Sequence, residues 1–576
     1  MKNIKRRTGV ACLSLLVLSL VLLAGGQAAA APVKNAWGVT LPADAAPLNQ
    51  QFVRLLSYEG TTADFAVAVY KRVGNSYSSI EGTPFFRINK NFELVPTGVT
   101  SYEASKDGKT WTFHMDPALK WSDGNPVTAD DVVFTFQYQA DPKHAWDFAW
   151  FWSDIVNWDD AVAGKVPLTS IGVRKVNTYT VQFMTSVPSP YFLSKALYVR
   201  PLSKAAFQKY GEYYNNNPAT AVSSSPYILK EWTKGKRMVY GPNTRYTGKL
   251  RPYLETIIID FGENESQFNA YLNNEIDMAD QYAFTPANIA TISGDSELNK
   301  EYHPGYGDFR TYYLGFDTTT KPFNDLRVRK AFAKAIDRDA IIKNVVGRQG
   351  MAAYSFLMPG FPDANSAALR EEDVNTYDVA AAQKLLADAG YPGGNGFPSL
   401  EMWLRKEPAL NEAIGEAIGS MLKDNLGINV QVSNKADPKI FMDTLNAHKL
   451  QFYFLSYGFD YLDPSNMLGI WVSGGRHAWS NPAFDRLMKD ATSLSGNQAK
   501  RDQEFKDAEK ILVDDVGGIF IYHVTPGNIY KPYMKGSELD PDKTGVAAWH
   551  WPGLEDVGVL NSTLYVSNDA PADRHM

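Results

Sequence analysis

Apolar and polar residues alternate between residues 110 and 115, and the apolar positions are Trp111, Phe113 and Met115. A period of two is typical of a strand with one buried face. A run of β-branched residues at 256–260 predicts a second strand, buried on both faces. Alternation at 428–432 predicts a third. The chain therefore contains strands spread over most of its length.

Helical periodicity marks other segments. Turn-forming residues at 122–126 lead to Thr128, which has Asp131 three residues later. That spacing resembles a capping box, so we predict a helix that starts there. Its apolar stripe consists of Val132, Val133 and Phe136.

Later helices are predicted at 325–336, capped by Asn324 or Asp325, at 339–347, and at 378–390. Gly427 then precedes the strand at 428–432. A helix followed by glycine and a strand is typical of α/β units. The order of helices and strands is irregular, with no fixed repeat, so we predict a mixed α/β chain.

The first thirty residues have the pattern of a secretory signal peptide. A basic start is followed by an apolar run at 10–24, which is shorter than the ~20 residues a membrane-spanning helix needs. The small residues Ala28 to Ala30 suit cleavage after Ala30. A twin-arginine signal at Arg6-Arg7 is an alternative, although Thr8-Gly9 follow where that signal has bulky apolar residues.

The chain has 576 residues, 44% of them hydrophobic and 21% charged, as in globular proteins. One core stops growing near ~250–300 residues, so we expect two lobes or more. Removal of residues 1–30 takes away the only Cys and changes the formal charge from −6 to −10. These features exclude disulfides and argue against a nucleic-acid partner. The aromatic content, 13%, fits either a well-filled core or a recognition surface.

No common catalytic signature is complete. Gly108-Lys109-Thr110 ends like a phosphate-binding loop, but the first glycine is missing and a strand follows. The eight histidines never stand three or four residues apart, as two metal ligands on one helix face would. We therefore expect no enzyme, no cofactor and no metal. A secreted hydrolase with two carboxylates across a cleft is the distant alternative.

Several motifs occur in the order found in one family. Residues 111–114 and 120–134, with Trp121-Ser122-Asp123-Gly124-Asn125-Pro126 at the centre, resemble the signature of the family 5 extracellular solute-binding proteins of ABC importers. Residues 225–232 are similar to that family's returning strand, and residues 322–338 to its most recognisable helix. The segments 381–391 and 481–487 also fit, so the resemblance covers residues 80 to 530.

The resemblance implies an α/β, two-lobed clamshell of the periplasmic-binding-protein type, with mixed sheets and an extra inserted domain. It divides the chain into a signal peptide (1–30), lobe I (31–81, 201–304 and 536–576), inserted domain II (82–200) and lobe III (305–535). It also implies a monomer in the periplasm that captures oligopeptides or dipeptides and delivers them to an ABC permease. A ligand that contacts both lobes only when they close shifts the open–closed equilibrium.

The segment 454–464 bears most directly on the ligand. In peptide-binding members, a Trp-x-x-Asp-Tyr segment carries the aspartate that pairs with the peptide's α-amino group. Asp460 and Tyr461 match this segment, and Tyr457 stands where Trp is usual. The resemblance thus assigns ligand contact to Tyr457, Gly458, Phe459, Asp460 and Tyr461. The alternative is that Asp460 only caps the turn before Asp463-Pro464.

Glu59 and Thr61 lie in a stretch that looks like one contributing to the same end of the pocket in oligopeptide binders. No residue is assigned to the far end of the ligand, where Arg405 and Lys406 are candidates and a plain surface position is the alternative.

An oligosaccharide ligand remains open, because the same family includes oligosaccharide binders that stack sugars on aromatic faces. Four tryptophans crowd into thirteen residues: Trp146, Trp150, Trp152 and Trp158.

Overall fold

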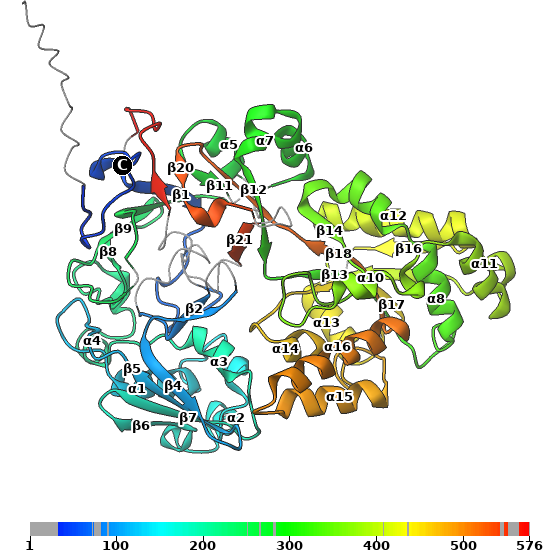
Figure 1. Cartoon of the computed structure of the whole chain (residues 1–576), viewed down its shortest axis with the longest axis horizontal. Helices are drawn as coiled ribbons and strands as arrows, with labels where there is room; N and C mark the ends of the chain where they lie inside the picture. The colour runs from blue at the N-terminus through cyan, green and yellow to red at the C-terminus, as the bar shows by residue number, and fades with distance from the viewer. Residues whose placement is uncertain are drawn as a thin grey trace, which may run out of the picture.

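The computed structural model describes residues 33–71, 73, 82–88, 92–249, 251–263, 266–279, 284–406, 408–434, 437–541, 547–550 and 564–574. The predicted signal peptide lies outside these residues. Figure 1 shows two bodies: elements β1 to β10 form the one drawn in blue to green, and elements from β13 to β18 form the other. Among the described helices, none is long and apolar enough to cross a membrane.

The first sheet joins segments that are far apart in the sequence. Strand β1 (Phe52–Ser57) lies parallel to β10 (Thr256–Phe261), followed by β9 (Arg237–Pro242) and β8 (Tyr227–Thr233). Val53 pairs with Ile257 and Leu55 with Ile259, and all four side chains are buried. The strand predicted at 256–260 is confirmed.

A separate antiparallel sheet carries the first predicted strand. Its order is β4 (Val99–Ala104), β5 (Thr110–Met115), β7 (Thr180–Met184) and β6 (Val173–Asn177). The predicted apolar positions of β5 are all buried, and helix α1 (Ala129–Ala140) has the predicted capping box of Thr128 and Asp131. Shorter elements complete this part: β2 (Phe86–Ile88), β3 (Leu94–Pro96), α2 (Trp158–Val162), α3 (Phe192–Lys195) and α4 (Lys204–Tyr210).

The second body is built on a six-stranded mixed sheet. Its order is β14 (Gly350–Ala352), β18 (Gly518–Val524), β13 (Thr311–Phe316), β17 (Phe452–Tyr457), β15 (Leu400–Leu404) and β16 (Val430–Ser433). Strand β15 runs parallel to β16 and β17, and the other pairs are antiparallel. The C-terminal ends of β15 and β17 and the start of β13 therefore lie at the same end of the sheet.

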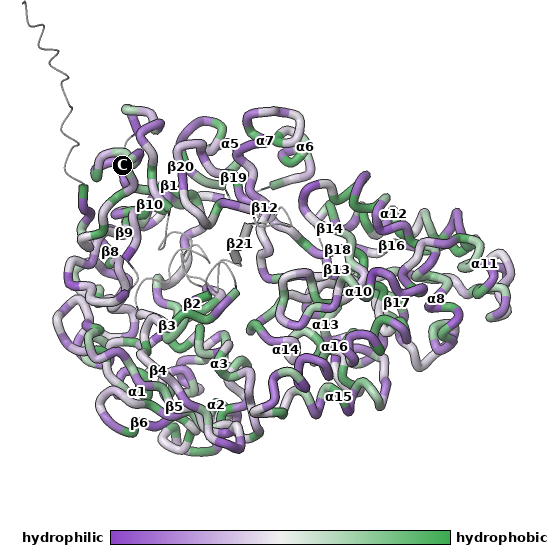
Figure 2. The backbone as a smooth tube through the Cα atoms, in the orientation of Figure 1, coloured by the Kyte–Doolittle hydropathy of each residue, from purple (hydrophilic) through white to green (hydrophobic). Residues whose placement is uncertain are grey.

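The helices of this body follow the predicted pattern. Asp325 caps α8 (Leu326–Ala335), Asp378 caps α11 (Val379–Asp388), and α9 (Arg338–Ile341) continues as one π-helical segment (Ile342–Val346) up to Gly347. The others are α10 (Ser366–Arg370), α12 (Ala409–Leu426), α13 (Pro438–Asn446), α14 (Pro464–Gly469), α15 (Pro482–Ser493) and α16 (Gln498–Asp514). Polar and apolar residues alternate along α15 and α16 (Figure 2), and α15 buries Phe484, Met488 and Ala491 on one face. These helices are therefore amphipathic covers of the sheet.

Two neighbouring passages connect the bodies. A four-stranded sheet, β11 (Met278–Ala279), β19 (Gly527–Tyr530), β12 (Tyr302–Gly307) and β21 (Ala547–His550), belongs to the first body. The chain leaves it after Gly307 and returns after Val524. Gly305 N donates to Pro526 O at 2.7 Å, and Val524 N donates to Arg310 O at 2.8 Å, so the two passages are hydrogen-bonded to each other.

The return passage affects one predicted boundary. Strand β19 lies inside the range 305–535 yet pairs with β11 and β12, so the chain rejoins the first body before residue 535. Gly307 has φ +56°, and a Cβ there would lie 2.6 Å from Pro526 Cγ, which favours glycine at this crossing. The remaining elements of the first body are α5 (Gln267–Leu272), α6 (Pro286–Gly294), α7 (Ser296–Glu301), β20 (Met534–Lys535) and β22 (Tyr565–Val566).

Candidate ligand-binding site

Asp460 lies in the loop between β17 and α14 and is held by its own lobe. Tyr457 Oη donates to Asp460 Oδ2 at 2.6 Å, and Asn466 Nδ2 donates to the same oxygen at 3.1 Å. The Asp460 N–H in turn donates to Asn466 Oδ1 at 2.7 Å. Within the described part of the chain, the other carboxylate oxygen receives no hydrogen bond and is reachable by solvent. The site thus presents one fixed carboxylate with a free oxygen.

The backbone before Asp460 is tied to the passages between the lobes. Phe459 N donates to Asp308 O at 3.0 Å, and a Cβ on Gly458 would lie 2.1 Å from Asp308 Oδ2. Glycine therefore lets the loop approach the Asp308 carboxylate. The Phe459 side chain is 1% exposed and packs on Phe309 and Phe361. In this conformation only its backbone can reach a ligand.

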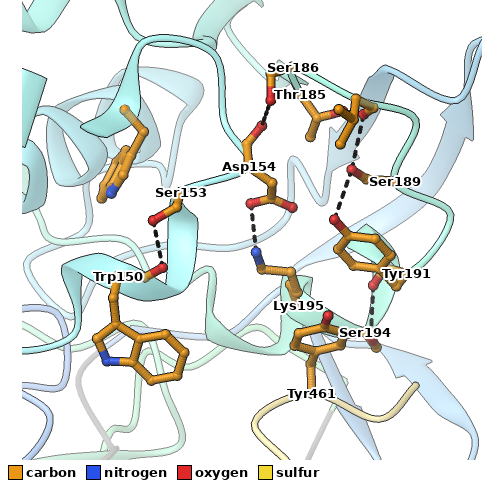
Figure 3. Close-up of polar contacts among 12 residues, drawn as sticks. Trp150, Ser153, Asp154, Thr185, Ser186, Ser189, Tyr191, Ser194, Lys195 and Tyr461 are labelled. Atoms are coloured by element: carbon orange, nitrogen blue, oxygen red, sulfur yellow. Dashed lines mark hydrogen bonds and ion pairs between the residues drawn. The ribbon is translucent and has the colours of Figure 1, made fainter. Parts of the chain in front are cut away.

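Residues from the inserted segment form the facing wall. Tyr198 Oη donates to the Asp460 main-chain oxygen at 2.9 Å. Tyr461 stacks on Tyr191, with ring centroids 5.2 Å apart and an interplanar angle of 22°. Figure 3 shows Tyr461 below Lys195, whose ammonium is 5.7 Å from the centroid of that ring. The segment 460–461 is therefore a contact point between the two bodies.

Lys195 and Asp154 form a buried ion pair behind this contact. Lys195 Nζ lies 2.6 Å from Asp154 Oδ1, and the two side chains are 5% and 10% exposed. The rings of Phe151 and Trp152 also surround the ammonium, at 4.8 Å and 5.3 Å from their centroids. Burial lowers the pKa of Lys195, while Asp154 and Asp460 raise it. This pair lies within the wall on which Tyr461 packs.

Two exposed aromatic residues lie on this side of the first body: Tyr70, which the sequence did not indicate, and Trp150 of the predicted tryptophan cluster. Tyr70 is 51% exposed and Trp150 is 52% exposed. Burial raises the pKa of Tyr70, and the negative charge of Asp460 raises it further, so its hydroxyl lies within electrostatic reach of that carboxylate. In contrast, Trp146, Trp152 and Trp158 are at most 5% exposed. The tryptophan cluster is core except for Trp150.

Glu59 and Thr61 have partners within the first body. The Glu59 carboxylate accepts hydrogen bonds from Trp232 Nε1 at 2.8 Å and from Gly235 N at 2.9 Å. Burial opposes the ionised form, but these bonds and the charge of Lys234 prevail and lower the pKa of Glu59. Thr61 Oγ1 donates to Lys71 O at 3.1 Å. The described contacts do not join either residue to Asp460.

Two lobes joined by paired passages, with a fixed carboxylate beside the junction, define a two-lobed ligand-binding protein. Residues 93–479 match the family model of bacterial extracellular solute-binding proteins, family 5. The periplasmic oligopeptide-binding protein OppA of Salmonella typhimurium is 30% identical over 451 residues, which are 76% of this chain and 81% of the relative. The chain therefore belongs to the family 5 extracellular solute-binding proteins.

Solved structures of murein peptide-binding proteins have the same fold. The unliganded open form of the periplasmic murein tripeptide-binding protein MppA, 26% identical, superposes with a TM-score of 0.77 over 91% of this chain and 99% of MppA. Another structure, of the MppA of Escherichia coli, is 27% identical and has a TM-score of 0.65 over 91% and 100% of the two chains.

Proposed function

We propose that this protein is the substrate-binding component of an ABC importer, and that it captures oligopeptides or dipeptides between its lobes and delivers them to a membrane permease. The observation that carries the proposal is the Asp460 carboxylate, which has one anchored oxygen and one free oxygen. An ammonium group is the natural partner of that oxygen, and every peptide with a free amino end supplies one. The names of the relatives point the same way.

The proposed roles of the other residues follow from their positions. Tyr457 orients the carboxylate, Gly458 and Phe459 hold the loop against the passages between the lobes, and Tyr461 joins the loop to the inserted domain. Glu59 and Thr61 remain predicted contacts that would require movement of the first lobe. We propose a monomer exported to the outer face of the cytoplasmic membrane, with the domain ranges given above and the return to lobe I placed before β19.

The proposed mechanism is lobe closure. The loop that carries Asp460 is hydrogen-bonded to the first passage through Phe459 N and Asp308 O, so a ligand bound there is in place before the distal parts of the lobes approach. Contacts made only in the closed state then supply the free energy that shifts the equilibrium toward closure. The permease recognises the closed form.

An oligosaccharide is the second candidate ligand. The exposed rings of Tyr70 and Trp150 are the observation that favours it, since sugars stack on such faces. Thermal unfolding in the presence of short peptides, their N-acetylated forms and oligosaccharides distinguishes the candidates, because a ligand that binds the folded state raises Tm. We expect stabilisation by free peptides alone. Stabilisation by sugars alone would refute the peptide proposal, and mass-spectrometric detection of cleaved products would indicate a hydrolase.

Peptide affinity is expected to decrease as the pH is lowered through the titration of Asp460. Burial raises the pKa of Asp460 above its ordinary value, although hydrogen bonds from Tyr457 and Asn466 oppose this effect. A bound ammonium favours the ionised carboxylate, so affinity is greatest above that raised pKa. Titrations at a series of pH values between about 4 and 7, where the peptide amino group stays protonated, check this. An affinity that is constant across the series contradicts it.

A further inference from the structure

Arg476 lies over the face of the Tyr457 ring, whose hydroxyl bonds to Asp460. It belongs to the connection between α14 and α15 and is half-buried. Its guanidinium carbon is 4.8 Å from the centroid of the Tyr457 ring, and the hydroxyl of that ring bonds to Asp460. The positive charge of Arg476 lowers the pKa of Asp460, which shows that the two groups are within electrostatic reach. Arg476 and Asp460 thus both lie at the end of the lobe III sheet where strand β17 finishes.

The guanidinium of Arg476 has no carboxylate partner among the described residues. This distinguishes it from other arginines of the same lobe. Arg310 pairs with Asp308 at 2.5 Å, and Arg501 pairs with Asp463 at 2.8 Å. The partners of Arg476 are neutral, namely the Tyr457 ring and the Tyr313 hydroxyl, so its charge is left available for an anion. The position next to the Asp460 carboxylate suggests that the partner is part of the ligand.

The local charge supports an anionic partner. Tyr313 is fully buried in β13, and burial raises the pKa of its hydroxyl, while the positive charges of Arg476, Arg405 and Arg310 lower it. Asp308 offsets Arg310, and Asp460 is the carboxylate left for the ligand ammonium. A ligand that brings only an ammonium adds positive charge to this edge. A ligand that also brings a carboxylate balances it.

We propose that Arg476 binds a carboxylate carried by the first or second residue of the ligand, so that the protein selects peptides with an acidic group close to the amino end. The inference rests on the proposed function, since the ammonium at Asp460 fixes the position of these residues. Successive Cα atoms of a peptide are about 3.8 Å apart, so an anion within two residues of the ammonium can reach across one tyrosine ring. Arginine suits the task because its planar fork binds carboxylates through two hydrogen bonds.

Two chemical sources can supply this carboxylate: an acidic side chain, or the carboxyl terminus of a dipeptide. Peptides with amidated carboxyl ends separate them. Ala-Glu-Ala amide and Ala-Gln-Ala amide differ only in the side-chain charge. The dipeptide Ala-Ala and its amide differ only in the terminal charge. Each pair is titrated calorimetrically into the wild-type protein, into Arg476→Gln, and into Arg486→Gln, which removes an exposed arginine of α15 as a control.

In at least one of the two pairs, we expect the wild-type protein and the Arg486→Gln variant to bind the peptide that carries the extra carboxylate about tenfold more tightly than its neutral counterpart. The Arg476→Gln variant is expected to bind both peptides of that pair equally. Loss of preference within the Glu–Gln pair identifies a side-chain carboxylate, and loss within the dipeptide pair identifies a terminal one. Equal binding of both members by the wild-type protein, or a preference that persists in Arg476→Gln, overturns the inference while leaving the proposed function intact. If no peptide binds the wild-type protein, the proposed function itself fails. Unchanged binding of Ala-Gln-Ala amide by Arg476→Gln shows that the variant is folded.

Discussion

Replacement of Asp460 by Asn is expected to weaken peptide binding by about 2–5 kcal/mol. The variant keeps the size of the side chain but removes the charge that faces the ligand ammonium, and the ammonium then remains desolvated without a counter-charge. The Tyr457 hydroxyl can still donate to the amide oxygen, so the loop between β17 and α14 keeps its support. Calorimetric titration of the wild-type and Asp460→Asn proteins with one tripeptide measures the difference.

A matched control is available in the same lobe. Asp490 is an exposed residue of α15, and Asp490→Asn changes the net charge by the same amount without touching the site. We expect this variant to bind like the wild-type protein. If Asp460→Asn also binds like the wild-type protein, the ligand ammonium is not at Asp460, and the residue only shapes its turn.

Removal of the Asp154 carboxylate is expected to lower the free energy of unfolding by about 3–5 kcal/mol. Asp154→Ala leaves the Lys195 ammonium buried among aromatic rings without its partner at 2.6 Å. Lys195 can escape this cost only in part by losing its proton, because the neutral amine stays buried without the hydrogen bond that the Asp154 carboxylate accepted. Chemical unfolding followed by tryptophan fluorescence provides the measurement.

The double variant Asp154→Ala, Lys195→Met tests the assigned cause. Since it removes both charges and retains an apolar side chain, we expect it to recover much of the lost stability. A single variant as stable as the wild-type protein would mean that the pair contributes little. A double variant no more stable than Asp154→Ala would attribute the loss to packing and not to the charge.

Short sequence patterns predicted the helices and strands well, because strand alternation and helix capping depend on residues only a few positions apart. The alternation at 110–115 corresponds to a strand whose Trp111, Phe113 and Met115 are 7%, 0% and 3% exposed. The caps at Asp325 and Asp378 also begin helices, since an aspartate that accepts from the first helical N–H groups acts over only a few residues. The two-lobed clamshell followed instead from the resemblance of several ordered motifs to the family 5 solute-binding proteins.

The surroundings of the site could not be predicted in this way. Tyr70 and Tyr198 lie far from Asp460 in the sequence and come near it only through the packing of the two bodies. Arg476 belongs to the same body as Asp460 and comes near it through the connection between α14 and α15. Phe459 is a residue that the sequence predicted as a ligand contact but whose side chain is buried. It stands between two site residues in sequence, but the chain leaves the sheet at Gly458 and turns its side chain into the core.

The most direct test of the central claim is calorimetric titration of the wild-type protein with one tripeptide and with its N-acetylated form. Acetylation removes the ammonium and leaves the rest of the ligand unchanged. If the free oxygen of Asp460 receives that ammonium, the free peptide binds and the acetylated peptide binds at least about thirtyfold more weakly, which corresponds to the lower end of the expected 2–5 kcal/mol. Equal affinity for the two peptides would contradict the account.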